Sequence, residues 1–379
     1  MKNNIPLFKI YWDKNDIKAV SDSVRRGMNW ACGPNIEKFE KIIGKYLGVK
    51  YVLTFSSGTS ALYTLLLAYN IGKGDEVIVP SFTFIATANA VLMTGAKPIF
   101  ADIELERYGL DPEDVKRKIT SKTKAIIPVH YGGCPCRIRE IKRIAEKNKL
   151  LLIEDAAESF GAKECGKFVG TFGNSAMFSL CQTKVFTTGE GGFITTNSKE
   201  IYEKLKLLRS HGRAETANYF TSGEHMDYIT LGYNFRMPDI IAALGISQIK
   251  KVNKLIDLRR KHAKYMTDIL SSTNNIIIPR FSSSIYHVYQ EYYIRIKDGE
   301  MTRNLLKKYL AERGIGTRIS FPPVHKSKFY KKLGYRENLK NTEFVSSYAL
   351  TLPLYPSLNK NEIYYIVNQI KNFFKNNEK

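Results

Sequence analysis

The 379-residue sequence is poor in the features that mark several specialised classes of protein. Its five cysteines are an odd number for a disulfide framework, and Cys134 and Cys136 have no second pair or nearby histidine at zinc-ligand spacing. The N-terminal stretch MKNNIPLFKIYWDK lacks the apolar core of a signal peptide. The longest apolar stretches, such as residues 150–153, are too short to span a bilayer. We therefore expect a cytoplasmic protein with reduced thiols, no structural metal and no membrane partner.

Acidic residues are also scarce relative to basic ones. The chain has 58 lysines and arginines against 36 aspartates and glutamates, which gives a formal net charge of +22. Such a balance favours anionic partners, among them nucleic acid, an acidic membrane surface or phosphorylated small molecules. The basic residues are spread out, however, and the sequence has no helix-turn-helix, zinc-finger or RNP-type signature. We expect no nucleic-acid partner, and a basic regulatory protein that binds nucleic acid is the alternative of a different class.

The first two-thirds of the chain alternate short apolar, β-branched runs with longer helical patterns. The predicted strands are residues 77–80 (VIVP), 98–101 (PIFA), 125–129 (AIIPV), 150–154 (LLLIE) and 192–196 (GFITT). The predicted helices between them include residues 60–68, 112–118 and 137–147. This alternation indicates βαβ units, and hence an α/β fold with a mostly parallel central sheet covered by helices on both faces.

The pattern changes near residue 244. An amphipathic pattern with a basic face covers residues 243–270 and predicts one helix that links two domains. Beyond it, residues 287–296 alternate like strands, residues 303–313 are helical in pattern, and the chain ends in a Lys/Asn-rich helix. We expect a large domain over residues 1–245, and a linking helix with a smaller α+β domain over residues 246–379.

Two segments of the large domain carry polar residues where ligands bind in α/β proteins. Residues 56–62 (SSGTSAL) follow an apolar stretch and open a helix, so their backbone N–H groups suit a phosphate. The alternative is a plain helix N-cap. Glu154 and Asp155 end a predicted buried strand, where a carboxylate points into the binding crevice and can pair with a cation or a protonated ring nitrogen. The alternative there is a structural carboxylate that caps the next helix.

A third segment, residues 178–192 (FSLCQTKVFTTGEGG), places Lys184 among small polar residues before a glycine-rich turn. A lysine near a phosphate site can act as a Schiff-base nucleophile if its pKa is lowered. The alternative is one more surface lysine in a basic protein. The order of the three segments, with Phe82 and Phe84 between them, is the order that a pyridoxal phosphate (PLP) site requires.

With these residues in view, the sequence resembles the sugar aminotransferases of the DegT/DnrJ/EryC1/StrS family, within the fold-type I PLP enzymes. The resemblance covers nearly the whole chain. Its motifs are residues 33–40 (GPNIEKFE), 55–62 (FSSGTSAL), 79–91 (VPSFTFIATANAV), 153–162 (IEDAAESFGA), 178–192 (FSLCQTKVFTTGEGG), 232–245 (GYNFRMPDIIAALG) and 322–325 (PPVH).

The resemblance implies a role for each matching residue. Lys184 matches the Schiff-base lysine, Asp155 the partner of the pyridine nitrogen, and Phe84 the aromatic that covers the ring. The residues implied at the phosphate are Ser57, Gly58, Thr59 and Ser179, with Asn234 reaching it from the neighbouring subunit. Glu158 stands beside the cofactor, where relatives often have Gln or His.

Further positions concern the substrate. His325 aligns with a histidine often found near the sugar, and Arg318 and Lys326 are candidates for the substrate diphosphate. Solvated surface charge is the alternative for both basic side chains. Cys181 departs from the family, because relatives often have His there, which puts local substrate contacts in doubt.

The implied activity is a ping-pong transamination that moves the amino group of L-glutamate to a keto-sugar nucleotide. A 4-keto-6-deoxyhexose is the favoured sugar, for amino-sugar and surface polysaccharide biosynthesis. The resemblance also implies a homodimer with shared active sites and residues 1–245 as the PLP-binding domain. The alternative within the family is a PLP-dependent sugar dehydratase; those relatives replace the lysine by histidine, and Lys184 counts against that reading.

Overall fold

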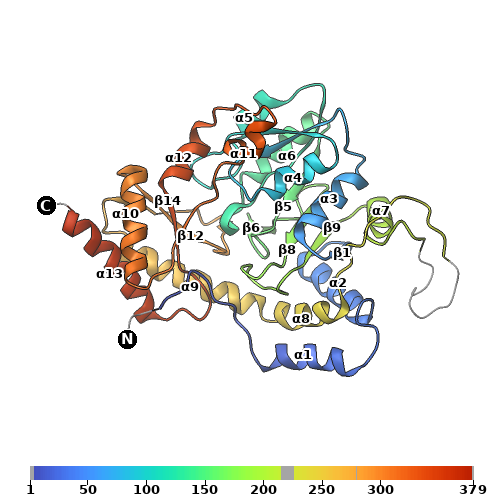
Figure 1. Ribbon diagram of the computed structural model, residues 1–379, viewed down its shortest axis with the longest axis horizontal. Coiled ribbons are helices and arrows are strands. Elements are labelled where there is room, and N and C mark those ends of the chain that lie inside the picture. The colour runs from blue at the N-terminus through green and yellow to red at the C-terminus, as the bar shows by residue number, and fades with distance from the viewer. Residues whose placement is uncertain (1–3, 215–225, 279, 378–379) are drawn as a thin grey trace.

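The computed structural model describes residues 4–214, 226–278 and 280–377, and its centre is a seven-stranded sheet (Figure 1). The sheet has the order β1-β9-β8-β5-β4-β2-β3. Its strands are β1 (Tyr51–Phe55), β2 (Glu76–Pro80), β3 (Lys97–Ala101), β4 (Thr123–Ile126), β5 (Leu151–Asp155), β8 (Ser175–Ser179) and β9 (Gly192–Thr196). Only the pairs that β9 makes with β1 and β8 are antiparallel. The expected mostly parallel α/β sheet is confirmed.

Helices cover both faces of this sheet, because its strands are apolar on both sides. Val77 and Val79 pack into one core and Ile78 into the other, as the two-residue period of a strand requires. One core holds residues of α3 (Gly58–Ala68), α4 (Ala86–Met93) and α7 (Lys199–Arg209). The other holds residues of α2 (Pro34–Leu47), α5 (Pro112–Lys118), α6 (Ile138–Lys147), α8 (Asp239–Ile249) and α9 (Val252–Leu270).

A second, four-stranded antiparallel sheet lies in the C-terminal third. Its order is β10-β12-β14-β13, and its strands are β10 (Ile276–Ile277), β12 (Tyr292–Ile296), β14 (Ala349–Leu352) and β13 (Arg318–Ile319). The helices of this region are α10 (Gly299–Glu312), α11 (Lys328–Lys332), α12 (Lys340–Tyr348) and α13 (Lys360–Asn377). Ile5 pairs with Ile315 and packs into the core of this region, so the N-terminal segment reaches the C-terminal sheet.

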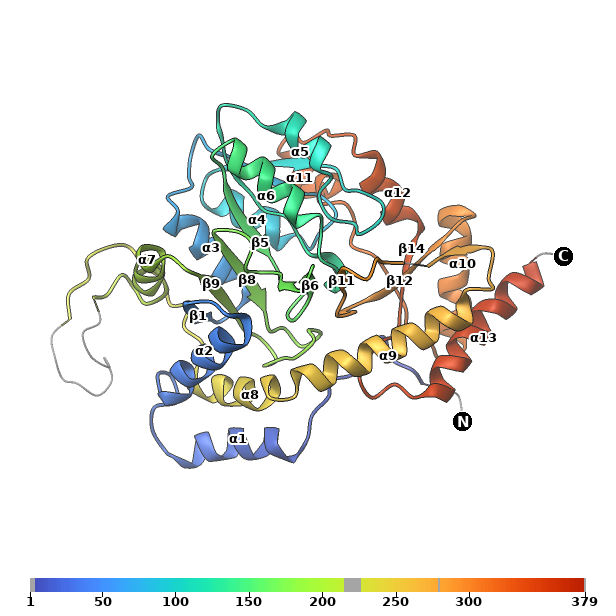
Figure 2. The same cartoon turned by 180° about the vertical axis from the view of Figure 1, so that it is seen from behind.

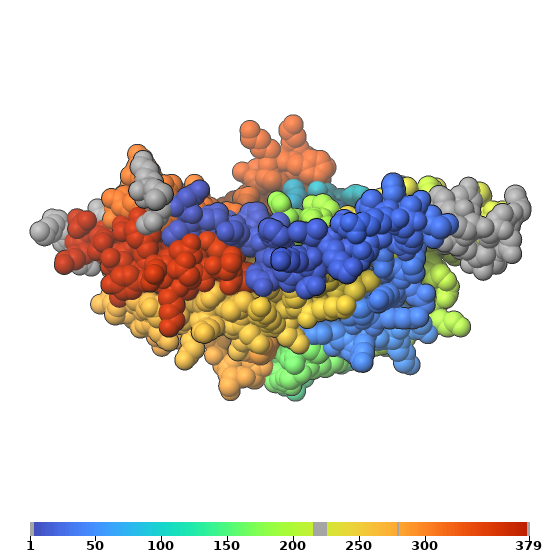
Figure 3. All heavy atoms as spheres, turned by 90° about the horizontal axis from the view of Figure 1, so that it is seen from below, coloured from blue at the N-terminus to red at the C-terminus, as the bar shows by residue number. Residues whose placement is uncertain are grey.

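Short elements complete the chain: α1 (Lys14–Arg25), the 3-10 turns Tyr131–Gly133 and Val324–Lys326, and a small sheet of β11 (Ile285–Tyr286), β6 (Lys163–Glu164) and β7 (Lys167–Phe168). Figure 2 shows α8 and α9 running along one edge of the molecule, with α1 below α8. In Figure 3 the blue N-terminal segment lies on the bottom face beside the red C-terminal helix. No helix in the described ranges has both the length and the apolarity needed to cross a bilayer.

The single linking helix predicted over residues 243–270 is wrong in detail. The structure has two helices, α8 and α9, which are separated at Lys250 and Lys251. The apolar positions continue in helical phase through the break, so the sequence pattern could not reveal it. The expected boundary at residue 245 falls inside α8.

Candidate active site

The predicted residues meet at the carboxyl ends of β5 and β8 and at the first turn of α3. Asp155 is the last residue of β5 and Ser179 the last of β8, and these strands are parallel neighbours. Carboxyl ends of adjacent parallel strands form the crevice where α/β folds bind ligands. β9 runs back beside β8 and places Gly192 opposite Ser179. Asp155, Ser179 and Gly192 therefore lie at the same edge of the sheet.

Asp155 is a buried carboxylate with only neutral hydrogen-bond donors around it. Its side chain is 4% exposed; Oδ2 accepts from the Thr87 hydroxyl at 2.8 Å and Oδ1 from the Ala157 N–H at 3.1 Å. Burial raises the pKa of Asp155 above its usual value, while these two hydrogen bonds and the charge of Lys184 oppose the shift. Such a carboxylate is poised to take a cationic N–H donor, as the pyridinium of the expected cofactor would supply.

Thr87 was not identified from the sequence as a site residue. Its hydroxyl contacts Asp155, Thr83 at 2.9 Å and the backbone oxygen of Phe84 at 3.3 Å. It thus joins the carboxylate to the segment that carries the predicted aromatic. The apolar and small residues around it in VPSFTFIATANAV gave no signal of this contact, which bridges 68 positions of the chain.

Lys184 lies next to a second buried carboxylate, Glu158. Its Nζ donates to Glu158 Oε1 at 3.4 Å, and the backbone N–H of Lys184 donates to the Cys181 oxygen at 2.9 Å. The other carboxylate oxygen of Glu158 accepts from the Gly132 N–H at 2.8 Å. The lysine is partly buried rather than a free surface cation. The structure therefore brings Lys184, Glu158 and Asp155 together, as the resemblance implies.

Ser57 is the N-cap of α3, which confirms that this serine caps the helix. Its Oγ accepts from the Ser60 N–H at 3.0 Å, and the Ser60 hydroxyl lies within reach of the Ser57 N–H at 3.2 Å, which forms a capping box. The cap does not exclude phosphate binding. The N–H groups of Gly58 and Thr59 belong to the first helical turn, where intrahelical acceptors are missing and the helix dipole is positive.

Glycines keep this turn open toward β8 and β9. A Cβ at Gly192 would lie 2.6 Å from the Gly58 nitrogen, and a Cβ at Gly58 would lie 3.1 Å from Ser179 Cβ. Only glycine at both positions allows the helix start and the two strands to approach this closely. The close approach gives a cradle of backbone N–H groups beside the Ser179 hydroxyl.

Phe84 presents its ring to the open side of this region. The side chain is 58% exposed, and its only ring contact within the described residues is with Phe321, at 5.7 Å between centroids. An exposed aromatic between a strand end and a helix start is available to stack on a flat ligand. Its position agrees with the expected ring-covering role, which no bound ligand tests here.

Of the two adjacent carboxylates, Glu154 and Asp155, Glu154 has a structural role. Its oxygens accept from the N–H groups of Gly170, Phe172 and Gly173, each at 2.7 Å, and one oxygen contacts His130 Nε2 at 3.0 Å. With four internal partners and full burial, this side chain holds the loop after β7 rather than a ligand.

Asn234 lies on a segment that borders the phosphate turn. The neighbouring Phe235 oxygen accepts from the Ser56 N–H at 2.8 Å, and the Asn234 side chain is exposed. Apolar side chains before it are also exposed, including Leu231 at 77% and Ile229 at 60%. The expected contact across a subunit interface remains a prediction.

His325, which the resemblance places near the sugar, is enclosed by protein, and its role at the substrate stays a prediction. Its ring is 2% exposed; Nδ1 lies 2.7 Å from the Ser81 hydroxyl and Nε2 lies 3.3 Å from Glu343. Burial lowers the pKa of His325, and Glu343 opposes that shift. A buried ring with both nitrogens engaged has no free polar atom for a substrate, so His325 holds the turn at Val324–Lys326 in this structure.

The two candidate phosphate-binding cations are both paired. Arg318 forms an ion pair with the buried Glu291 and lies 5.1 Å from the Phe321 ring centre. Lys326 pairs with Glu343 near the surface. Glu291 was missed from sequence because it stands in an alternating apolar segment, HVYQEYYIRI, with no local motif.

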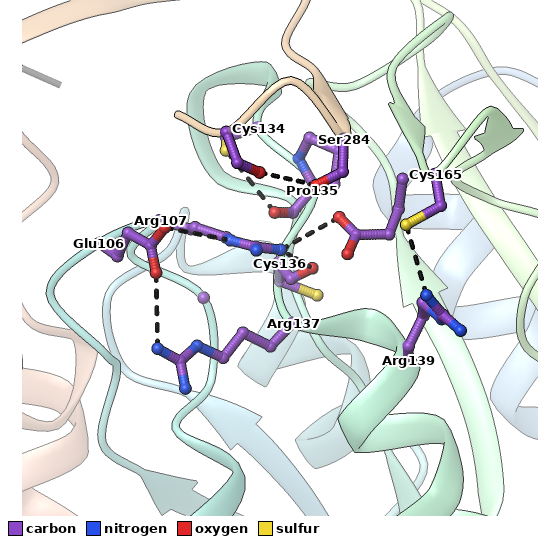
Figure 4. A network of polar contacts seen from close by, with 12 residues as sticks. Glu106, Arg107, Cys134, Pro135, Cys136, Arg137, Arg139, Cys165 and Ser284 are labelled. Atoms are coloured by element: carbon purple, nitrogen blue, oxygen red, sulfur yellow. Dashed lines mark hydrogen bonds and ion pairs between the residues drawn. The ribbon is translucent and has the colours of Figure 1, made fainter. Parts of the chain in front are cut away.

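The five cysteines are all free thiols. Figure 4 shows the polar network around three of them, in which Arg107 binds Glu164 at 3.1 Å and Arg139 contacts the Cys165 sulfur at 3.3 Å. Burial raises the pKa of Cys134 and Cys136 well above the usual thiol value. These thiols are packing residues, and no metal-ligand cluster of His, Cys, Asp or Glu occurs in the ranges described.

Comparison with known proteins gives a consistent result over the full chain. The model of the DegT/DnrJ/EryC1/StrS aminotransferase family matches residues 11–371. The GDP-perosamine synthase of Escherichia coli O157:H7 is 37% identical over 344 residues, which cover 90% of this chain and 91% of that protein.

Solved structures agree. Helicobacter pylori PseC, an aminotransferase involved in the biosynthesis of pseudoaminic acid, has a TM-score of 0.93 and 28% identity, and the match covers 99% of this chain and all of that one. The PLP form of the sugar aminotransferase Spr1654 from Streptococcus pneumoniae has a TM-score of 0.92 and 26% identity, with 99% of each chain covered.

Proposed function

The chain belongs to the DegT/DnrJ/EryC1/StrS aminotransferase family, and from this premise we propose that it transfers the amino group of L-glutamate to a keto-sugar nucleotide. Membership makes it a PLP-dependent sugar aminotransferase. The finer assignment is a nucleotide-linked 4-keto-6-deoxyhexose as the acceptor, for amino-sugar and surface polysaccharide biosynthesis. The name of the relative GDP-perosamine synthase supports this choice of sugar.

The residues present fit the cofactor. The start of α3 places the N–H groups of its first turn beside Ser179, and Asp155 is a buried carboxylate without a direct cationic partner among the described side chains. Bound PLP supplies an electron sink for the electron pair left on the donor Cα when its proton is removed. We assign the phosphate to Ser57, Gly58, Thr59 and Ser179, and the ring to Phe84 and Asp155.

Lys184 carries the chemistry in this proposal. Its amine would hold the cofactor covalently and, once free, would take the proton from the donor Cα as a base. Glu158 holds the Lys184 amine through the contact at 3.4 Å, and the Gly132 N–H fixes Glu158 in turn. Asp155, buried from solvent, would stabilise positive charge on a pyridine nitrogen held next to it.

The observation that carries the proposal is the lysine at position 184, placed beside two buried carboxylates at the end of β8. A family dehydratase would have histidine there, and an imidazole could not form the covalent bond that a primary amine forms. No second function is favoured by a specific contact. The high positive charge is shared by many surface lysines and defines no groove for nucleic acid.

We further propose that the enzyme is a cytoplasmic homodimer with shared active sites. Exposed apolar side chains near Asn234 support this, because contiguous apolar surface beside a polar site is typical of interfaces. Arg318 remains a candidate for an anionic group of a substrate, although its pair with Glu291 must rearrange or be shared to allow this.

The experiment that tests the function is a substrate panel. Purified enzyme loaded with PLP is incubated with L-glutamate and UDP-, dTDP- or GDP-linked keto-hexoses, and amino sugar and 2-oxoglutarate are measured together. We expect equal amounts of the two products with one nucleotide-linked 4-keto-6-deoxyhexose. Formation of a deoxygenated keto sugar together with 2-oxoglutarate and ammonia, and without an amino sugar, would establish the dehydratase instead.

A further inference from the structure

Glu291 is a further buried carboxylate next to the segment that carries Lys184, and the proposed reaction does not use it. It lies just before β12 and its side chain is 8% exposed. Oε1 pairs with Arg318, whereas Oε2 is buried without a hydrogen-bond partner in the described part of the chain. Burial raises the pKa of the Glu291 carboxyl, the charge of Glu158 raises it further, and Arg318 and Lys184 oppose the shift. The charges of Glu291 and Lys184 therefore act on each other.

A single residue, Gly132, connects the two glutamates through its N–H and its carbonyl oxygen. The Gly132 N–H donates to Glu158 at 2.8 Å, and the Gly132 oxygen accepts from the Glu291 N–H at 3.1 Å. Gly132 has φ +61°, and a Cβ there would lie 2.8 Å from the Tyr293 ring. A side chain at this position would push the two segments apart. The turn thus fixes Glu291 relative to the carboxylate that contacts Lys184.

The neighbouring Gln290 fixes the lysine loop itself. Its side-chain N–H donates to the backbone oxygen of Thr183, the residue before Lys184. A cavity of about 30 Å³ separates the two segments and is lined by Thr183, Gln290 and Glu291, among others. The Glu291 side chain itself is 8% exposed, so solvent screens its charge only in part. The guanidinium of Arg318 is more exposed than Glu291, and water screens its charge more strongly.

We propose that Glu291 is a positioning residue of the transamination site, whose negative charge favours the protonated form of the nitrogen that Lys184 contributes. This inference rests on the proposed function. The charged and titratable groups that face Glu291 are Glu158, Lys184, Arg318, Arg259, Tyr131 and Tyr293. Of these, Glu158 acts on the lysine in the same direction as Glu291, and the two arginines act against it.

The test is a spectroscopic titration of the enzyme loaded with PLP. The visible absorption band of the bound cofactor is followed against pH in the wild type, Glu291→Gln, Glu291→Asp and the control Glu312→Gln, a surface position on α10. Loss of the negative charge in Glu291→Gln should lower the midpoint by about 0.5–1 pH unit. Glu291→Asp retains the charge and should stay within about 0.2 unit of the wild type, as should the control.

The outcomes separate this inference from the proposed function. A wild-type protein that never develops the band would refute the function itself. A normal wild-type band combined with an unshifted Glu291→Gln midpoint, or equal shifts in both Glu291 variants, would overturn the role of Glu291 alone. If Glu291→Gln does not fold, Glu291→Asp decides: a wild-type midpoint agrees with the proposal, and a shift of about 0.5 unit or more contradicts it.

Discussion

The side chains of the site have different roles, because each makes a different kind of contact. Lys184 offers a primary amine next to Glu158, and Asp155 offers a buried negative charge held by neutral donors. Adjacent Glu154 has four internal partners and serves the fold. Neighbouring carboxylates in one strand thus differ in role because the strand alternates its side chains between two faces.

Lys184→Ala should abolish transamination and leave the fold intact. Removal of the amine removes both the covalent attachment of the cofactor and the proton-transfer group, so we expect at least about a thousandfold lower kcat. The matched control is Lys204→Ala, a lysine on the surface of α7. Steady-state kinetics and circular dichroism check the prediction. Near-normal turnover in Lys184→Ala would refute the assignment.

Asp155→Asn should stabilise the cofactor-free protein while it destroys activity. Burial raises the pKa of Asp155, so the folded state binds its proton more tightly than the unfolded state does. The ionised carboxylate therefore lowers the free energy of unfolding at any pH above the pKa that Asp155 has in the folded state. This loss of stability disappears as the pH falls to the usual pKa of an aspartate. We expect a Tm about 2 °C higher for the variant at pH 8, with the gap closing in acid.

Calorimetry of the cofactor-free wild type and variant across this pH range provides the check. A constant gap at every pH, or a lower Tm for Asp155→Asn at pH 8, would show that burial of this charge carries no cost. Addition of PLP should reverse the order, because only the carboxylate can pair with a cationic ring nitrogen.

At the scale of elements, the site depends on how closely α3, β8 and β9 approach one another. A Cβ at Gly192 would collide with the backbone of Ser57 and Gly58, and a Cβ at Gly58 would lie in tight contact with Met177 and Ser179. The capping box of Ser57 and Ser60 fixes the residue at which α3 begins. The N–H groups of its first turn therefore have a fixed position beside Ser179. The anion site is therefore a property of packed elements rather than of one loop.

Gly192→Ala should weaken cofactor binding. The new Cβ would lie 2.6 Å from the Gly58 nitrogen, so the helix start must move away from β9. We expect about a tenfold or greater loss of PLP affinity, equivalent to about 1.4 kcal/mol. Gly72→Ala is the matched control, because its Cβ would meet only the Thr94 oxygen, at 3.7 Å. Fluorescence titration of the cofactor-free proteins with PLP measures both; equal affinities would contradict this account of the cradle.

Sequence patterns predicted those parts of the fold that depend on local spacing. The strand expected over residues 77–80 and the helix over 112–118 match β2 and α5 closely. β8 was not predicted as a strand, because SAMFS has little β-branched character and takes its form from pairing with β5 and β9. The break between α8 and α9 was missed because the apolar pattern continues through it.

The difference between local patterns and tertiary contacts also explains which site residues could be predicted from the sequence. Lys184 and Asp155 stand in motifs that a sequence can show, whereas Thr87, Gly132 and Glu291 act through contacts between distant segments. His325 was placed near the sugar by its motif, and only the packing of Ser81 and Glu343 around it shows that it is enclosed. Tertiary contacts of this kind leave no periodic or compositional trace.

At the scale of the whole molecule, one face near the site is incompletely covered in a single chain. Ile229 and Leu231 are exposed, and Asn234, which follows them on the same segment, is exposed as well. Isolated apolar side chains on a surface need no explanation, but a group beside a polar crevice is typical of an interface. A second copy of the chain is the occupant that the resemblance implies.

Asn234→Ala should weaken PLP binding through that interface. Loss of one side-chain hydrogen bond to a charged phosphate should cost about 1.5–3 kcal/mol, or roughly ten- to a hundredfold in affinity. Analytical ultracentrifugation shows whether the protein is a dimer of 43.2 kDa chains, and fluorescence titration gives the affinity. A monomeric wild type, or an unchanged affinity in Asn234→Ala, would argue against shared sites.

The most direct test of the central claim is to locate the covalent bond between cofactor and protein. The loaded enzyme is reduced with borohydride, digested, and analysed by peptide mass spectrometry. The account predicts pyridoxyl phosphate on the peptide that contains Lys184, at that residue alone among the lysines of the chain. Stable modification at another lysine, or none in a protein that carries out the reaction, would contradict it.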